Sequence, residues 1–207
     1  MADVTSWPSI SKHGLLSTTA LLDLFEINGN QRQAIESCHR PLSVEITHPK
    51  HGTAVIRDQI PMRESALRKC LQGCSPQQWY EFLNRKVFFW VTEERVQTLL
   101  KARAYRSNDH LVITVNSSQL LAQHGERTLL SPINSGSTIY RPVQRSLSTF
   151  KTLVEYPYAE RRKLRGTAHA IAETAIDYSV PNLTAFVERV ERRRGDRVLE
   201  TIYPKKR

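Results

Sequence analysis

The chain of 207 residues carries a net charge of +10, from 30 lysines and arginines against 20 aspartates and glutamates. Its hydrophobic fraction of 40% is ordinary for a globular protein and excludes an intrinsically disordered chain. No apolar run approaches the roughly 20 residues of a membrane-spanning helix, and the start lacks the basic and apolar blocks of a signal peptide. We therefore expect a cytoplasmic protein without a membrane partner.

The cysteines Cys38, Cys70 and Cys74 are too few and too scattered for a disulfide scaffold, which favours a reducing compartment. A structural zinc site needs four ligands, and the histidines nearest to Cys70 and Cys74 lie in a separate turn, so no metal site is predicted. The sequence contains no repeat, no low-complexity segment and no clear linker. We therefore expect a single domain over residues 1–207.

The first half of the chain is predicted to contain mainly helices with short strands between them. Gly14 can adopt the left-handed conformation that ends a helix, and Ser17 or Thr18 is placed to cap the next one. Ser75 followed by Pro76 marks another helix start. In chain order we expect helices over 7–17, 18–27 and 31–40, strands over 42–48 and 52–59, helices over 63–73 and 75–86, a buried strand over 87–92 and a helix over 93–105.

The second half is richer in strands and loops. We expect a strand and short helix over 110–125, a strand over 127–133, a polar loop over 134–150, a basic helix or loop over 156–166, a strand over 168–183, an amphipathic helix over 181–195 and a strand over 197–204. Strands and helices do not alternate regularly, which argues against a doubly wound parallel sheet. The pattern predicts an α+β fold with a mostly antiparallel sheet and helices concentrated in the first half.

Glu173 lies near the middle of the strand 168–183, among mostly small and apolar residues. Period-two alternation places Ile171, Glu173, Ala175 and Asp177 on one face. Burying a carboxylate in such a strand costs free energy unless the group has a partner or a task. Spacing alone leaves two interpretations open: a structural ion pair with an arginine, or a functional carboxylate.

The positive charge is concentrated near the C-terminus. Residues 141–207 contain 15 basic and 8 acidic residues, a net charge of +7. This imbalance favours a polyanionic partner, with nucleic acid first and an acidic protein second. The alternative is that these charges only solvate a helix end and a tail.

Known nucleotide-binding and hydrolase motifs are missing: the chain has no GxGxxG, GxxxxGK[ST], HExxH or GxSxG pattern. Four other stretches carry a resemblance to a known family, namely WPSISKHGLLS, VIRDQIPM, LNRKVFFWV and AIAETAIDYSVP. In this order they resemble DarT-like ADP-ribosyltransferases, bacterial toxins that modify DNA bases. The chain is more similar still to uncharacterised bacterial proteins that carry RDQxPM, LNxxVFFW and LSPINSGST.

The resemblance implies an ADP-ribosyltransferase-like split sheet and NAD as the co-substrate. It assigns Glu173 to the ribose or to activation of the acceptor, because a carboxylate stabilises a cation-like ribose. It makes Arg57 the candidate for the pyrophosphate, although a salt bridge of Arg57 with Asp58 or Glu64 is the alternative. Phe89 and Trp90 would stack on nicotinamide, unless they belong to the core.

One feature of the superfamily is missing from this sequence. Its members place a histidine before the N-terminal motif to hold a ribose, and no histidine precedes Trp7 here. Thr5 is a poor substitute at this cofactor-binding position. The expectation is therefore either a start that lies upstream or a diverged member. Two other functions stay open: a non-catalytic nucleic-acid-binding module, and an NAD glycohydrolase.

Two stretches are candidates for contact with the acceptor. Asn134 and Ser135 in LSPINSGST offer short polar groups suited to a base or phosphate, unless the stretch is a plain connecting loop. Phosphate contacts are expected from a basic cluster, to which Tyr156 and Tyr158 would add base stacking. This cluster consists of Arg161, Arg162, Lys163 and Arg165. A toxin-like protein would also have an antitoxin or another protein partner.

Overall fold

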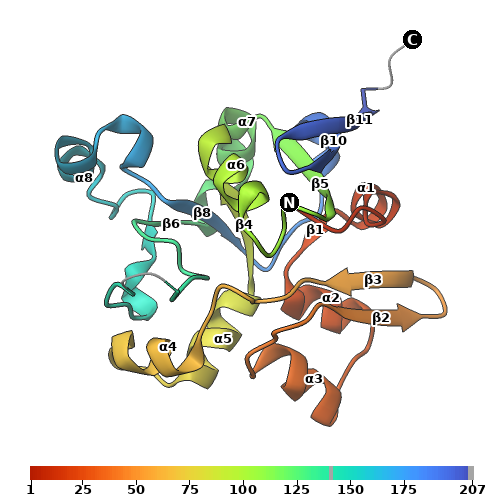
Figure 1. Cartoon of the computed structure of the whole chain (residues 1–207), viewed down its shortest axis with the longest axis horizontal. Coiled ribbons are helices and arrows are strands. Elements are labelled where there is room, and N and C mark those ends of the chain that lie inside the picture. Colours follow the sequence, from red (N-terminus) through yellow and green to blue (C-terminus); the bar gives the residue numbers. More distant parts are fainter. Residues whose placement is uncertain (140–141, 205–207) are drawn as a thin grey trace.

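The computed structural model describes residues 1–139 and 142–204, and its architecture is α+β, as predicted (Figure 1). The helices are α1 (Trp7–His13), α2 (Thr18–Leu24), α3 (Gly29–Glu36), α4 (Glu64–Cys70), α5 (Pro76–Asn84), α6 (Glu93–Lys101), α7 (Ser117–His124) and α8 (Tyr158–Arg165). The first six end by Lys101, so helices do gather in the first half.

The strands are β1 (Leu15–Leu16), β2 (Val44–His48), β3 (Gly52–Ile56), β4 (Lys86–Trp90), β5 (Asp109–Val115), β6 (Thr128–Ser131), β7 (Lys151–Thr152), β8 (Glu173–Asp177), β9 (Ser179–Val180), β10 (Val187–Arg194) and β11 (Arg197–Tyr203). They form a four-stranded sheet in the order β4-β8-β6-β7, a three-stranded sheet β11-β10-β5, and the pairs β2-β3 and β1-β9. Every pairing between these strands is antiparallel, which confirms the predicted sheet type.

The strand β8 lies inside the four-stranded sheet and is covered on both faces. Ala175 packs into one hydrophobic cluster with the helices α4 and α5. Ile176, on the opposite face, packs into a second cluster with α1, β5 and β10. Both side chains are fully buried. A third cluster joins α2 and α3 to the β2-β3 hairpin. The strand that carries Glu173 is therefore held from both sides by apolar packing.

Gly14 fixes how the N-terminal segment joins this sheet. The residue ends α1 with a φ of +78°, and a Cβ there would lie 2.3 Å from the carbonyl oxygen of Val180. Only glycine allows this conformation and this close approach together. The approach lets β1 pair with β9, in the register Leu15 to Val180. The N-terminus is thus tied to the segment that directly follows β8.

The prediction of a helix over 181–195 is wrong. A short 3-10 turn (Leu183–Ala185) is followed by β10, which pairs with β5 on one side and with β11 on the other. Glutamate and arginine favour helices, but two neighbouring strands satisfy the backbone of this segment, and tertiary pairing overrides the weak local preference. The turn Gly195–Asp196 between β10 and β11 is a two-residue glycine-containing connection typical of a hairpin.

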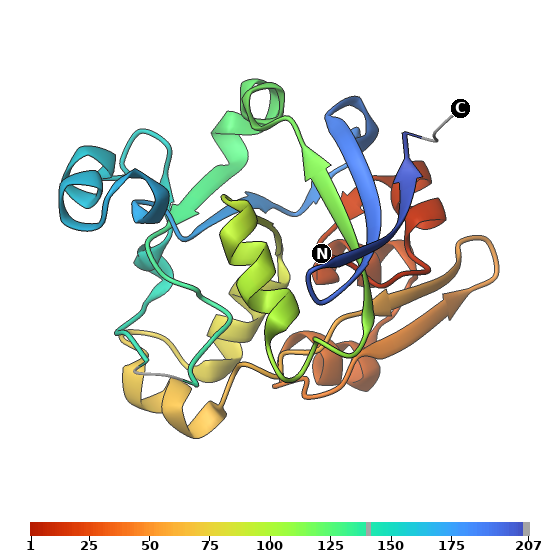
Figure 2. The same cartoon turned by 45° about the horizontal axis from the view of Figure 1, so that its top comes forward.

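The helix α8 differs from the other helices because none of its residues is buried. It lies at one side of the molecule, opposite to the β2-β3 hairpin, in both views (Figures 1 and 2). No helix in residues 1–139 and 142–204 is long and apolar enough to cross a membrane. The three cysteines are all free.

Candidate active site

A cavity of about 310 Å³ opens beside β4 and β8. Its wall contains parts of RDQIPM (57–62), LNRKVFFW (83–90) and NSG (134–136), together with Glu173. These segments are far apart in the sequence, and the fold brings all of them to one space. Its volume lies at the lower end of the range usual for ligand pockets, roughly 300–1,000 Å³.

Glu173 begins β8, and its side chain is only 4% exposed. The carboxylate oxygen Oε2 accepts two hydrogen bonds from Ser135, one from the backbone N–H at 3.0 Å and one from the hydroxyl at 2.6 Å. In the described part of the chain no group donates to Oε1, and this oxygen is not among the fully buried unpartnered atoms. Glu173 therefore has one anchored oxygen and one available oxygen.

The protonation of Glu173 is set by opposing effects. Burial disfavours the charged carboxylate and raises its pKa to about 7. The two hydrogen bonds from Ser135 and the positive charges of Arg145 and Arg95 act in the opposite direction. A carboxyl group with this pKa exists in both forms at neutral pH, which suits a group that takes up or releases a proton.

Trp90 and Phe88 form the aromatic wall of the cavity. Trp90 lies directly opposite Glu173 in the register between β4 and β8, and Phe88 lies opposite Ala175. The prediction paired Trp90 with Phe89, but alternate residues of a strand point to opposite faces. Phe89 contributes to the cavity wall and also packs against the hydrophobic cluster on the other side of the sheet. Phe88, 37% exposed, shares the face of Trp90 and was not among the predicted site residues.

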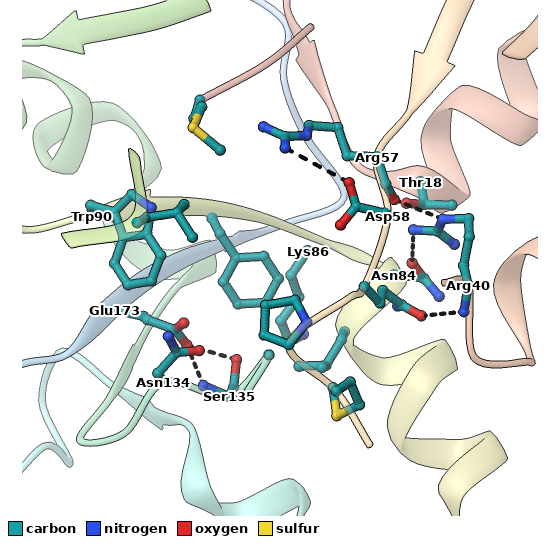
Figure 3. Close-up of a pocket in the computed structure, with 18 of the residues that line it drawn as sticks. Thr18, Arg40, Arg57, Asp58, Asn84, Lys86, Trp90, Asn134, Ser135 and Glu173 are labelled. Atoms are coloured by element: carbon teal, nitrogen blue, oxygen red, sulfur yellow. Dashed lines mark hydrogen bonds and ion pairs between the residues drawn. The ribbon is translucent and has the colours of Figure 1, made fainter. Parts of the chain in front are cut away.

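Arg57 lies across the cavity from Glu173 (Figure 3). One of its nitrogens, Nη2, is 3.8 Å from a carboxylate oxygen of Asp58, and the guanidinium lies 5.2 Å from the ring centroid of Tyr105. The hydroxyl of Tyr105 donates to Asp58 at 2.7 Å. The other terminal nitrogen, Nη1, is buried without a partner in the described residues. Arg57 is thus oriented by neighbours and retains unused donor capacity.

Two further polar groups in the wall were not predicted. The ammonium group of Lys86 is 3.2 Å from Asp177, and burial lowers the Lys86 pKa. Arg40, also buried, donates to the backbone oxygen of Arg57 at 2.8 Å and to Asn84 at 3.3 Å. Lys86 could have been found from the alternation in KVFFW, since it shares a face with Phe88 and Trp90.

A second cavity of about 170 Å³ adjoins the first one. The two cavities share Met1, Thr18 and Arg57 as lining residues. Residues of α1 and of β3 form much of its wall. Arg57 therefore stands at the junction of two spaces, and together they suit an elongated ligand with a negative charge in its middle.

Several predicted site residues lie elsewhere. Thr5 is exposed, forms a hydrogen bond with Asp3 and lines neither cavity. The basic cluster lies on α8, outside the cavity wall: Arg161, Arg162, Lys163 and Arg165. Tyr158 is 40% exposed, but Tyr156 is buried and donates to the backbone of Ala170, so it is not free to stack on a base.

The loop predicted over 134–150 contacts Glu173 directly, which was not expected. Asn134 and Ser135 both line the cavity, and Figure 3 shows them beside Glu173. Asn134 is exposed and available to a ligand, whereas Ser135 is buried and occupied by the carboxylate. In residues 1–139 and 142–204 no three side chains of histidine, cysteine, aspartate or glutamate come together in a way that could hold a metal ion.

Comparison with known protein families assigns the chain to one family. It belongs to DUF7002, a family of unknown function, whose family model matches residues 1–187. Searches among curated proteins and among solved structures find no match to this chain. All residues of the cavity wall lie within the matched range. The cavity is therefore built from the part of the chain that the family model describes.

Proposed function

We propose that this DUF7002 protein has an ADP-ribosyltransferase-type fold and uses NAD to modify a base of a nucleic acid. The observation that carries the proposal is the shared cavity, in which the carboxylate of Glu173 and the guanidinium of Arg57 face one space from segments far apart in the chain. These are the two residues that the resemblance to DarT-like enzymes assigns to the reaction.

The residues of the two cavities fit the parts of NAD. Trp90 offers an aromatic face for the nicotinamide ring beside Glu173. Arg57 has an unpartnered nitrogen for the pyrophosphate and lies where the cavities join. The second cavity then remains for the adenosine part. Thr5 plays no part in this arrangement, so the ribose contact of the missing histidine has no counterpart in it.

The chemistry breaks the bond between nicotinamide and ribose, and nicotinamide leaves with the electron pair. The negative charge of Glu173 stabilises the positive charge that develops on the ribose. A nitrogen of the acceptor base forms the new bond to the ribose and loses a proton. The carboxylate of Glu173 accepts this proton, as its pKa of about 7 allows.

Nucleic acid as the acceptor is supported by the charge of α8. Three of its basic residues are exposed, namely Arg162, Lys163 and Arg165, and none forms an ion pair within the described part of the chain. Arg161 donates to the backbone of Pro132, next to the segment that carries Ser135. The basic helix therefore contacts the loop whose residues Asn134 and Ser135 line the cavity, and its exposed charges would attract the phosphates of a bound strand.

The test is incubation of the full chain with labelled NAD and with DNA, RNA or protein acceptors. We expect label on nucleic acid with the wild type and a loss of about 100-fold or more in Glu173→Gln, a size typical of a lost acid–base group. Glu94→Gln, an exposed glutamate on α6, is the matched control.

Other products would point to other functions. Free ADP-ribose as the sole product would identify an NAD glycohydrolase, in which water replaces the base. Salt-sensitive binding of nucleic acid with intact NAD would contradict the proposal and favour a non-catalytic binding module.

A further inference from the structure

The loop that follows β6 is fixed at several points by polar contacts. At its start the hydroxyl of Ser131 donates to the backbone oxygen of Ile133 at 2.9 Å. At its end Thr138 donates its N–H to Pro61 at 2.9 Å and accepts a 2.6 Å hydrogen bond from the N–H of Arg63. Ser135 lies between these two anchors, so its position is determined by the loop as a whole.

Arg145 holds Ser135 from the side away from Glu173. The Arg145 side chain is buried, and its Nη1 donates to the backbone oxygen of Ser135 at 3.0 Å, while Nε donates to the backbone oxygen of Val143 at 3.1 Å. In the described residues Arg145 forms no ion pair with a carboxylate. Burying a guanidinium without such a pair costs desolvation free energy, so a role for Arg145 beyond stability is expected.

The backbone of Arg145 is docked on the end of α4. Its N–H donates to Cys70 at 2.8 Å, and its carbonyl accepts from Gln72 at 2.9 Å. Leu71 and Arg145 form an isolated parallel bridge. The backbone of Arg145 is therefore fixed, and its guanidinium contacts the carbonyl of Ser135. Ser135 in turn contacts the carboxylate of Glu173.

We propose that Ser135 and Arg145 are positioning residues for Glu173. Ser135 fixes the oxygen Oε2 so that Oε1 faces the cavity, and Arg145 fixes Ser135 through its carbonyl while adding positive charge behind the carboxylate. The contribution of this arrangement to the reaction rests on the proposed function, but the arrangement itself can be tested without any activity.

Two arginines act electrostatically on the Glu173 carboxyl group. Arg145 lies behind the loop, and Arg95 of α6 also acts on the carboxyl group. Other charged groups line the cavity, namely Arg40, Arg57, Asp58, Lys86 and Met1 with its terminal amino group. Ser135 and Arg145 both lower the Glu173 pKa against the effect of burial. Removing the hydroxyl of Ser135 or the charge of Arg145 should therefore raise the pKa of Glu173.

The experiment is a titration of Glu173 by NMR in full-length protein labelled with ¹³C at glutamate Cδ, with Glu173→Gln used to assign the signal. In Ser135→Ala we expect the midpoint to rise by roughly one pH unit or more, because a hydrogen bond to a charged group has that size. Ser137→Ala, in the same loop but without contact to the Glu173 carboxylate, is the matched control and should leave the midpoint in place.

Two substitutions of Arg145 separate charge from geometry. Arg145→Gln removes the charge and should raise the midpoint, whereas Arg145→Lys keeps the charge and should raise it less. Thermal unfolding of each variant identifies those that lose the fold, and Ser135→Ala, which deletes a single hydroxyl, keeps the test valid if both Arg145 variants unfold.

An unchanged midpoint in folded Ser135→Ala would overturn the positioning proposal whether or not the protein consumes NAD. If NAD is consumed, the acid limb of the pH–rate profile should move upward with the NMR midpoint. A protein that shows the NMR shift but no NAD turnover would contradict only the proposed function.

Discussion

The strand β10 and the helix α8 have similar sequences and opposite environments. VERRRG, at the end of β10, and AERRKLRG, in α8, each place a glutamate before a run of basic residues and a glycine. In β10 the arginines are neutralised by glutamates and aspartates of the same strand, of β5, β11 and α6. In α8 the basic side chains have no acidic partner in the described part of the chain.

The difference lies in which element each run forms. Arg193 in β10 is buried and contacts Glu191 at 2.6 Å and Glu93 of α6 at 2.5 Å. The basic residues of α8 extend into solvent from a helix without a buried residue. From net charge alone, both runs are possible binding sites for a polyanion. In the described part of the chain the arginines of β10 are paired with carboxylates, so only the basic residues of α8 are free to bind a partner.

The largest effect is expected from Arg193→Met in β10. Removing Arg193 leaves the buried Glu191 carboxylate with only Arg189, 46% exposed, as its partner at 3.3 Å, which should lower the free energy of unfolding by about 3 kcal/mol, the lower end of the range for a broken buried pair. Denaturant unfolding measures this change. Arg194→Met, in the same strand but 56% exposed and paired with Asp109, is the control and should cost less than about 1 kcal/mol. Equal costs for the two variants would contradict the distinction between buried and exposed pairs.

The next effect concerns binding rather than stability. Replacing Arg162, Lys163 and Arg165 of α8 by glutamine should weaken binding to nucleic acid without lowering the melting temperature. If each residue contacts one phosphate of a duplex, the slope of log affinity against log salt should decrease by about 0.9 per residue removed. Fluorescence anisotropy at several salt concentrations measures it. The matched triple variant in β10, with Arg189, Arg192 and Arg194 replaced by glutamine, should leave the slope nearly unchanged.

A smaller effect is expected at acidic pH. The hydrogen bond from Arg193 lowers the pKa of Glu93 below its ordinary value of 4.5. A lowered folded-state pKa gives stability that is fully present above the unfolded pKa and is lost as the pH falls through the folded pKa. Because Glu93 is 56% exposed, we expect less than about 1 kcal/mol. Unfolding between pH 6 and 3 should show this loss in the wild type, and Glu93→Gln should remove it.

The smallest effect is expected from Leu164→Ser in α8. This leucine is 75% exposed, so its replacement should change the free energy of unfolding by no more than about 0.5 kcal/mol. The control is Leu183→Ser, since Leu183 is fully buried. A marked destabilisation by Leu164→Ser would show that α8 packs more closely than its exposure indicates.

Local rules predicted much of the fold because they depend on neighbouring residues. Gly14 ends α1, and Ser17 and Ser75 cap the helices that follow them, as expected. The face of β8 that carries Glu173 and Ala175 also followed from alternation. These features need no knowledge of distant contacts.

Long-range contacts decided the rest. The amphipathic pattern of residues 181–195 was misleading because this segment pairs with β5, far away in the sequence, and with β11, across a two-residue turn, and so forms a strand. The hairpin of β10 and β11 was not predicted, although Gly195–Asp196 is a typical two-residue hairpin connection. Arg145, within a polar and turn-rich stretch, gave no sign of burial, since its position depends on docking to Cys70. The site therefore needed the register of β4 against β8 before its aromatic wall could be identified.

The close approach of Gly14 to Val180 also bears on the order in which the molecule assembles. The partner of β1 lies almost at the other end of the chain, so this pairing cannot form on the ribosome until most of the protein has emerged. Contacts between such distant segments form slowly because the intervening chain must first be ordered. The N-terminal segment borders both cavities, which means that neither is complete before this late contact forms. We therefore expect a nascent chain to acquire its candidate active site only in the final stage of folding.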